Sequence, residues 1–319
     1  MLKIVNNDIL TQSFVNDYYE ILDKRLKKII NQKGLPKTEN RTAVKLSPND
    51  IKLLKKFNNE KMIKTLMSAK AKYIRNFIEL ISKKYPTFNH KKGQRKSNIN
   101  KVLFNIFVDN GYNNVNKFKF IDDIGLKSCP YCNRTFIYTL NNKRNLKPQI
   151  DHFYHKANYP YLAMSYYNLI PSCPTCNGFG AKEDKDSYED GLKHPYEIES
   201  NDFKFSFDIE SINIIDNKLD EDSVKIELKT KYQANSDYFG LEELYKEHRD
   251  VVVELYQKFY QENTKEHFRQ LSNSLESIGI DKDEVYKLVT CSYQKDEDLH
   301  KRPLSKLIKD ISKELELIK

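Results

Sequence analysis

Two cysteine pairs constrain this chain more than any other feature of its sequence. Residues 129–132 read Cys-Pro-Tyr-Cys and residues 173–176 read Cys-Pro-Thr-Cys, and 40 residues separate the two pairs. Two such pairs can bring four thiolates to one metal, because each short turn places its two sulfurs side by side. Chance cysteines in a core would not explain the repeated spacing and the repeated proline. The sequence therefore predicts a structural Zn²⁺ site with the ligands Cys129, Cys132, Cys173 and Cys176.

The segment between the pairs is longer than in a compact zinc ribbon, so it must contain structure of its own. Residues 135–138 read Thr-Phe-Ile-Tyr, residues 141–145 are polar, and residues 147–152 lead to an Asp-His pair. This order favours a β-hairpin. We expect strands at 135–138 and 147–152, with the turn at 141–145.

Asp151 and His152 stand midway between the cysteine pairs. Hydrolysis of a phosphodiester needs a base that activates water and a cation that stabilises the developing charge. We expect His152 to be the base, because imidazole accepts a proton near neutral pH. Asp151 would point to the opposite side of an extended strand, where its carboxylate can hold a metal ion.

Two asparagines complete the candidate site. Asn177 follows the last cysteine at the start of an expected helix, and its amide oxygen is a second ligand candidate beside Asp151. Oxygen ligands of this kind favour Mg²⁺ or Mn²⁺ over zinc. Asn168 would constrain the loop that orients His152. Taken singly, each of these residues has a plain alternative as a cap of a strand, helix or turn.

Taken together, residues 125–190 resemble the zinc-framed HNH endonucleases, which have the ββα-metal fold. The resemblance rests on Cys-x-x-Cys, then Asp-His, then Asn-Leu-x-x-x-Cys-x-x-Cys-Asn. It implies that His152 is the general base, that Asp151 and Asn177 bind the catalytic cation, and that Asn168 positions the base. It also implies a phosphate-contacting lysine at Lys182 or Lys185.

The sequence departs from the family pattern in two places. The third family position is Asn177 rather than histidine, and Gly-Phe-Gly at 178–180 interrupts the expected helix. His155 and His194 are further imidazoles near the site, and we interpret both as residues without a catalytic role.

A finer similarity concerns residues 149–154, Gln-Ile-Asp-His-Phe-Tyr, and residues 166–173, Tyr-Tyr-Asn-Leu-Ile-Pro-Ser-Cys. These resemble HNH subunits of bacterial defence systems against phage, such as Septu. The similarity implies a partner ATPase and a target in invading or cellular nucleic acid.

Charge is unevenly distributed along the 319 residues. Residues 1–100 contain 23 Lys and Arg against 8 Asp and Glu, which suits contact with nucleic acid, although a lysine-rich helix surface is often only solvated. No apolar run approaches the length of a membrane span, and the first residues lack a signal peptide. We therefore expect a cytoplasmic protein without membrane contact. In such a compartment Cys291, which stands alone, is expected to be a buried apolar thiol.

The expected fold class is α+β: a mostly helical chain with a central ββα-metal module and a small β segment. Apolar periodicity predicts a helix over 15–30, a second from Ser47, one or two more up to residue 81, and another over 99–109. Alternation predicts strands at 203–209 and 224–228, separated by a turn at 216–222. Helices are expected again from residue 241 and after Pro303. The predicted domains are residues 1–120, 121–195 and 196–319.

These patterns favour a metal-dependent endonuclease that hydrolyses DNA. Two alternatives stay open at this stage. One is a zinc-stabilised nucleic-acid-binding or scaffold module without catalysis, and the other is an RNase toxin with the same site. The sequence does not separate DNA from RNA, because the phosphate chemistry is shared and no base-reading motif is present.

Overall fold

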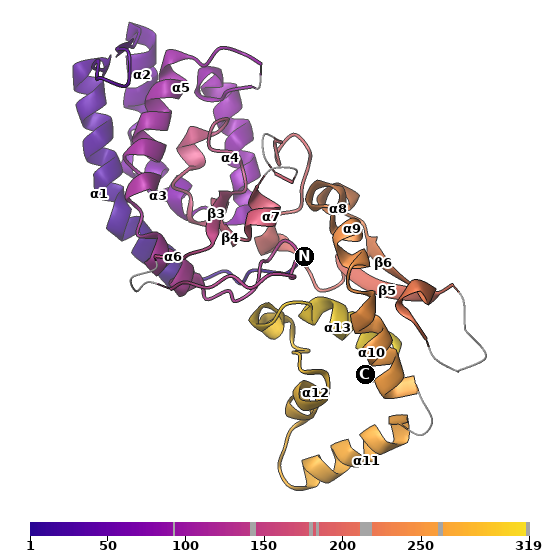
Figure 1. Ribbon diagram of the computed structural model, residues 1–319. Coiled ribbons are helices and arrows are strands. Elements are labelled where there is room, and N and C mark those ends of the chain that lie inside the picture. Colours follow the sequence, from indigo (N-terminus) through magenta and orange to yellow (C-terminus); the bar gives the residue numbers. More distant parts are fainter. Residues whose placement is uncertain are drawn as a thin grey trace.

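The computed structural model describes residues 1–91, 93–140, 145–178, 181–182, 185–210, 219–260 and 264–316. These residues form a mostly helical α+β chain with three two-stranded antiparallel sheets. Helices of the N-terminal part surround the sheet of β3 (Gln149–His152) and β4 (Leu169–Ser172) (Figure 1). Some C-terminal helices lie beside the sheet of β5 (Phe203–Ile209) and β6 (Val224–Thr230), whereas the helices within 264–290 lie apart from it. Within the described residues, no helix combines the length and the apolar character needed to cross a membrane.

Six α-helices make up most of the N-terminal part, and their buried residues form one continuous core with the central segment. They are α1 (Asp8–Gln32), α2 (Pro48–Phe57), α3 (Glu60–Ser68), α4 (Ala71–Lys84), α5 (Asn98–Phe104) and α6 (Lys117–Ile124). A π-helical segment, η2 (Asn105–Asp109), continues α5. Short 3-10 helices are η1 (Pro86–Phe88), η3 (Tyr112–Asn114), η4 (Pro160–Leu162) and η5 (Tyr166–Asn168).

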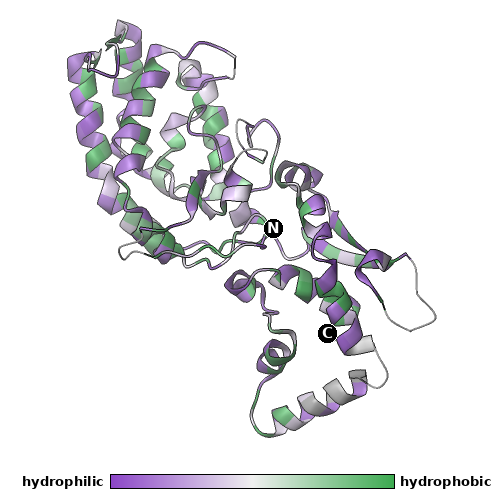
Figure 2. Cartoon of the chain, viewed as in Figure 1, coloured by the Kyte–Doolittle hydropathy of each residue, from purple (hydrophilic) through white to green (hydrophobic). Residues whose placement is uncertain are grey.

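Helix α1 confirms the predicted amphipathic pattern. Leu22, Leu26 and Ile29 are fully buried at helical spacing, and hydrophobic and hydrophilic residues alternate along the helix (Figure 2). The helix ends before Gly34, which begins the pair β1 (Gly34–Leu35) and β2 (Val44–Lys45). Gly34 has φ of 138°, and a Cβ there would lie 2.0 Å from the Val44 carbonyl oxygen, so only glycine is accommodated.

The stretch from Ser47 to residue 84 is divided into three helices, in line with the expected start and stop. Ser47 caps α2 in a capping box with Asp50, which satisfies two free donors at the helix start. Helix α4 ends before Pro86. The predicted helix over 99–109 is confirmed as α5 followed by η2.

The central segment consists of strand β3 (Gln149–His152), strand β4 (Leu169–Ser172) and the one-turn helix α7 (Pro174–Asn177). The two strands are antiparallel, with Asp151 opposite Ile170 and His152 opposite Leu169. All four residues of β4 are buried. In this register the start of β3, at Gln149, lies opposite Ser172 and next to the second cysteine pair, and the Asp-His pair lies at the other end of the strand.

The predicted hairpin between 135–138 and 147–152 is wrong in its pairing. Residue Phe136 instead pairs with Ser128, and the Ile137 amide donates to the Lys127 carbonyl at 2.8 Å. The chain thus folds back on the segment before Cys129, and β3 pairs with the apolar, buried β4. Leu140 and Leu146 do pair across the expected turn, whose residues 141–144 lie outside the described part.

The C-terminal part contains the predicted strand pair, β5 (Phe203–Ile209) and β6 (Val224–Thr230), in antiparallel register. Most of the expected turn between them lies outside the described residues, which resume at 219. The α-helices that follow are α8 (Gln233–Phe239), α9 (Leu241–Lys246), α10 (Arg249–Tyr260), α11 (Thr264–Ser277), α12 (Lys282–Thr290) and α13 (Ser305–Glu314). The 3-10 helices here are η6 (Pro195–Glu197), η7 (Glu221–Ser223) and η8 (Asp296–Lys301).

A second, smaller core joins β5 and β6 to helices α9, α10 and α13, with Phe205, Tyr245 and Ile311 among its buried residues. The expectation for Cys291 is wrong. This residue caps the C-terminus of α12 in the left-handed conformation, with φ of 52°, and it is exposed. A helix cap lies at the surface, so the neighbouring apolar residues did not indicate burial here.

Candidate metal centre and active site

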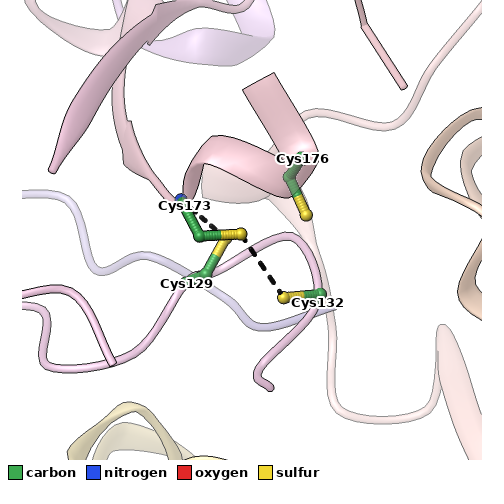
Figure 3. Close-up of side chains that lie close together, drawn as sticks. All are labelled: Cys129, Cys132, Cys173 and Cys176. Carbon is green, nitrogen blue, oxygen red and sulfur yellow. Dashed lines mark hydrogen bonds between the residues drawn. The ribbon is translucent and has the colours of Figure 1, made fainter. Parts of the chain in front are cut away.

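The four paired cysteines converge on one point. Their sulfur atoms all lie within 4.8 Å of one another, and Figure 3 shows them pointing together from α7 and from the loop at 129–132. All four residues are buried, and the Sγ atoms of Cys132 and Cys173 are 3.9 Å apart. Tetrahedral zinc with bonds of about 2.3 Å separates its sulfur ligands by roughly 3.8 Å. The cluster therefore matches a tetrahedral zinc site in ligand type and in sulfur spacing.

Backbone donors support negative charge at these sulfurs. The Cys173 amide donates to the Cys129 Sγ at 3.4 Å, and the Arg134 amide donates to the Cys132 Sγ at the same distance. Burial nevertheless raises the pKa of Cys129 well above its ordinary value, because a thiolate is poorly solvated there. A bound divalent cation offsets that cost, which is the usual reason for such a cluster.

The turn that carries the first cysteine pair is fixed by distant parts of the chain. Asn133 is buried in the left-handed conformation, with φ of 52°. Its side chain donates to the Leu299 and Arg302 carbonyls and accepts from the Lys306 amide. The Tyr245 hydroxyl donates to the Cys132 carbonyl at 2.6 Å. The metal centre therefore joins the central segment to the C-terminal helices.

Asp151 and His152 are both buried at the end of β3. The Asp151 carboxylate accepts a hydrogen bond from the Tyr131 hydroxyl at 2.6 Å and pairs with the Lys182 ammonium group. Tyr131 lies between the two cysteines of the first pair. The Tyr131 side chain thus connects the turn of the first cysteine pair directly to Asp151.

His152 is held by a backbone carbonyl and an aromatic ring. Its Nε2 lies 3.3 Å from the Ala163 carbonyl oxygen, and its ring centroid is 4.4 Å from that of Tyr112. A carbonyl oxygen only accepts, so Nε2 carries the proton and Nδ1 keeps the free electron pair. Burial lowers the pKa of His152 well below its ordinary value, and the charges of Lys156 and Lys182 add to this. The imidazole is therefore neutral at pH 7.

Asn168 fastens the loop that follows His152. Its Oδ1 accepts from the Tyr154 amide at 2.7 Å, and its Nδ2 donates to the carbonyls of Tyr154 and Leu162. Ala163, whose carbonyl orients His152, is the residue after Leu162. The fully buried Asn168 thus contacts both sides of the loop on which the position of His152 depends.

Asn177 lies at the same side of β3 as Asp151. Its Nδ2 donates to the Gln149 Oε1 at 2.8 Å, and Gln149 and Asp151 are two residues apart on the strand. The donor assignment leaves the Asn177 Oδ1 without a hydrogen bond among the described residues. Asn177 is therefore anchored to β3 two residues before Asp151.

The two candidate phosphate-binding lysines differ in their surroundings. Lys182 is buried and also donates to the His152 carbonyl at 2.5 Å, so its ammonium group is already engaged. Lys185 is exposed, and its Nζ lies 4.9 Å from the ring centroid of Tyr238. The segment 183–184 between them lies outside the described residues.

The two further histidines take different positions. His155 is half-buried, and its carbonyl accepts from the Asn158 and Tyr159 amides in a turn. His194 is buried against Phe153, with ring centroids 4.2 Å apart. Burial lowers the pKa of His194 to about 3, so this histidine is a neutral core residue.

Sequence reasoning did not single out Tyr112, Tyr131 or Lys156. For Tyr131 the sequence contained one indication, its position inside the first cysteine pair. In the structure its hydroxyl donates to Asp151. For Tyr112 and Lys156 the sequence contained no indication, because only packing brings them to His152. In comparisons with protein-family models, curated proteins and solved structures, the chain matches none.

Proposed function

We propose that the chain is an HNH-type endonuclease that hydrolyses phosphodiester bonds in DNA with a divalent cation. The observation that carries this proposal is the orientation of His152 on the β3–β4–α7 unit. Its Nε2–H is held by the Ala163 carbonyl, so Nδ1 is the available base. The order of strand pair, short helix and four-cysteine frame supports the ββα-metal fold.

In this mechanism the His152 Nδ1 accepts a proton from water. The water oxygen bonds to phosphorus as the bond from phosphorus to the 3′ oxygen breaks, and that oxygen takes up a proton from solvent. A neutral imidazole at pH 7 is in the protonation state that a base requires. Asn168 acts as a positioning residue, because it holds the loop that fixes the Ala163 carbonyl.

Asp151 and Asn177 would hold the cation, Mg²⁺ or Mn²⁺. The donor set suits a hard ion: the Asp151 Oδ1 and the Asn177 Oδ1 make no hydrogen bond to described residues. Magnesium often takes only one or two protein ligands, with water and phosphate for the rest. When bound, such an ion stabilises negative charge on the departing oxygen.

The ammonium group of Lys182 competes with that ion, because it already neutralises Asp151. This contact specifically favours a second candidate function, a zinc-stabilised nucleic-acid-binding module without catalysis. In that case Asp151 and Lys182 are a buried structural pair. The two functions differ in one measurable property, cleavage that depends on the added cation.

DNA is proposed as the substrate, and a phage-defence role with a partner ATPase is proposed from the resemblance of residues 149–154 and 166–173 to HNH subunits of such systems. The excess of lysine and arginine in residues 1–100 supports contact with nucleic acid. RNA is the alternative substrate.

The test is to incubate the purified protein with supercoiled plasmid, linear DNA and RNA, each with Mg²⁺, Mn²⁺ or EDTA. We expect cation-dependent cleavage of DNA, and a loss of about 10²–10⁴ in rate for His152→Ala. His155→Ala is the matched control, because it changes a nearby histidine that has no proposed role. Equal rates for His152→Ala and the parent would rule out this catalytic site. Binding without cleavage under every condition would favour the non-catalytic module. Cleavage of RNA alone would show that RNA is the substrate instead of DNA.

A further inference from the structure

Three lysines from separate segments lie over two aromatic rings, Tyr112 and Phe118. The Nζ atoms of Lys117 and Lys156 lie 4.7 and 5.0 Å from the Tyr112 ring centroid. The Nζ of Lys147 lies 4.8 Å from the ring centroid of Phe118, the neighbour of Lys117 in the chain. Lys117 begins α6, Lys147 precedes β3, and Lys156 follows β3. Folding therefore places three positive charges on one side of the central segment.

This lysine cluster adjoins the candidate base. The Tyr112 ring packs edge-on against His152, so Lys117 and Lys156 lie over the ring that covers the imidazole. Lys156 is four residues beyond His152 in the chain, and its Nζ lies over the same Tyr112 ring.

The cluster has no acidic partner of its own in the described part of the chain. None of the three lysines forms an ion pair there, whereas Lys119, two residues beyond Lys117, pairs with Asp123 at 2.9 Å. Asp151 acts on Lys156 only at longer range, and Lys182 already neutralises it. Asp151, the acidic residue that acts on the lysine cluster, is therefore already paired with another lysine.

The three lysines also repel one another. Burial lowers the pKa of Lys117, and the charges of Lys147 and Lys156 lower it further. Burial lowers the pKa of Lys156 as well. All three side chains are half-buried, so solvent screens this repulsion only in part. An anion bound among them would relieve it.

We propose that Lys117, Lys147 and Lys156 bind the phosphates of a nucleic-acid strand on either side of the phosphodiester bond that is broken by the water activated by His152. This inference rests on the proposed function, since it assigns the substrate contacts of the same site. A strand is favoured over a free phosphate because the ammonium groups are spread over two rings, Tyr112 and Phe118, instead of converging on one atom. Lys156 lies over the ring that packs against His152, and Lys117 and Lys147 lie at the start of α6, over Tyr112 and Phe118.

The experiment measures binding of a short fluorescein-labelled DNA strand by anisotropy, without added divalent cation, over a range of KCl concentrations. Each phosphate contact contributes roughly 0.7 to the slope of log affinity against log salt for single strands, and about 0.9 for duplex. We expect the triple variant Lys117→Gln, Lys147→Gln, Lys156→Gln to lower the slope by about 2. The matched control changes the three exposed lysines Lys246, Lys282 and Lys313 to Gln and should leave the slope unchanged.

Single variants distinguish the loss of a phosphate contact from the loss of folding. Lys117 also donates to the Tyr112 and Asn113 carbonyls of η3, so its loss can disturb the turn that precedes α6. Lys156 makes no such bond among the described residues, so Lys156→Gln should lower the slope and Lys156→Arg should restore it, with circular dichroism and zinc content unchanged. An unchanged slope in the triple variant, or an equal fall in the control, would overturn the proposal.

Inorganic phosphate and a mononucleotide serve as competitors. If either one displaces the labelled strand at a concentration close to that of unlabelled strand, the cluster is a site for small phosphates and the proposed strand contact is wrong. These binding assays require no cleavage, so their outcome does not depend on whether His152 is the catalytic base. A protein that cleaves normally after loss of the cluster refutes this inference alone, and one that binds through the cluster but never cleaves refutes the catalytic proposal alone.

Discussion

Lys182 and Asp151 form a buried ion pair at the end of β3, and the same ammonium group donates to the His152 carbonyl. The Tyr131 hydroxyl is the other donor to this carboxylate. A positive charge therefore already stands at the residue that is proposed to hold a cation. Removing either partner of a buried pair leaves an uncompensated charge, so the pair is costly to break.

Lys182→Met is expected to increase the affinity for Mn²⁺. The variant frees Asp151, and a divalent cation would then compensate the buried carboxylate. Without metal we expect a loss of about 3–5 kcal/mol in the free energy of unfolding, partly recovered when Mn²⁺ is added. Electron paramagnetic resonance of free Mn²⁺ measures the affinity, and urea unfolding measures the stability. Lys185→Met, at the exposed neighbour, is the control; equal Mn²⁺ affinity in both variants would show that Lys182 does not compete.

Asn133→Ala is expected to destabilise the protein by about 3 kcal/mol or more. It removes side-chain hydrogen bonds to three C-terminal residues, each worth about 1 kcal/mol, and leaves alanine in the left-handed conformation. Asn145→Ala tests the backbone effect alone, because Asn145 has φ of 48° but is exposed. Denaturant unfolding compares the two, and similar losses would mean that the buried hydrogen bonds contribute little.

Cys132→Ser is expected to lower the zinc content well below one ion per chain and to reduce stability strongly. Zinc binding contributes roughly 10–16 kcal/mol in isolated zinc fingers. Here the turn that would lose its metal is also bonded to the C-terminal helices, through the Tyr245 hydroxyl and the Cys132 carbonyl. Cys291→Ser changes an exposed cysteine outside the cluster and should keep full zinc content. Elemental analysis and thermal unfolding are the measurements. Full zinc content in Cys132→Ser would contradict the assignment of this ligand.

Stability is expected to fall on acidification below pH 6.5. The pKa of His194 is about 3 in the folded protein, against 6.5 for an unperturbed imidazole, so the unfolded state binds more protons between these values. Stability is therefore fully present above pH 6.5 and decreases toward pH 3, by about 1.4 kcal/mol per pH unit for one histidine. His152 acts in the same direction.

His194→Asn should reduce this pH dependence by about one proton, because asparagine keeps an acceptor for the Tyr196 amide but does not titrate in this range. His90→Asn, at a partly exposed histidine, is the control. Urea unfolding at several pH values gives the slope. The same slope in His194→Asn and the parent would place the acid sensitivity elsewhere.

The sequence alone determined the parts of this protein that depend on local spacing. Two C-x-x-C pairs predicted the cysteine cluster because the distance between sulfurs in such a turn is set within four residues. Apolar residues that recur every 3.6 or every 2 positions located α1, β5 and β6, because the buried face of a helix or strand requires apolar residues at that spacing. The order of Asp151, His152, Asn168 and Asn177 indicated which residues to examine.

The tertiary structure alone decided which distant residues meet. It paired β3 with β4 instead of with residues 135–138, placed Lys182 on Asp151, and exposed Cys291. It also placed Lys117 and Lys156 over Tyr112, and Lys147 over Phe118. Such contacts depend on how whole faces of helices and sheets pack against each other. Burial and charge across the molecule determine which of the alternative contacts forms. No short stretch of sequence contains that information.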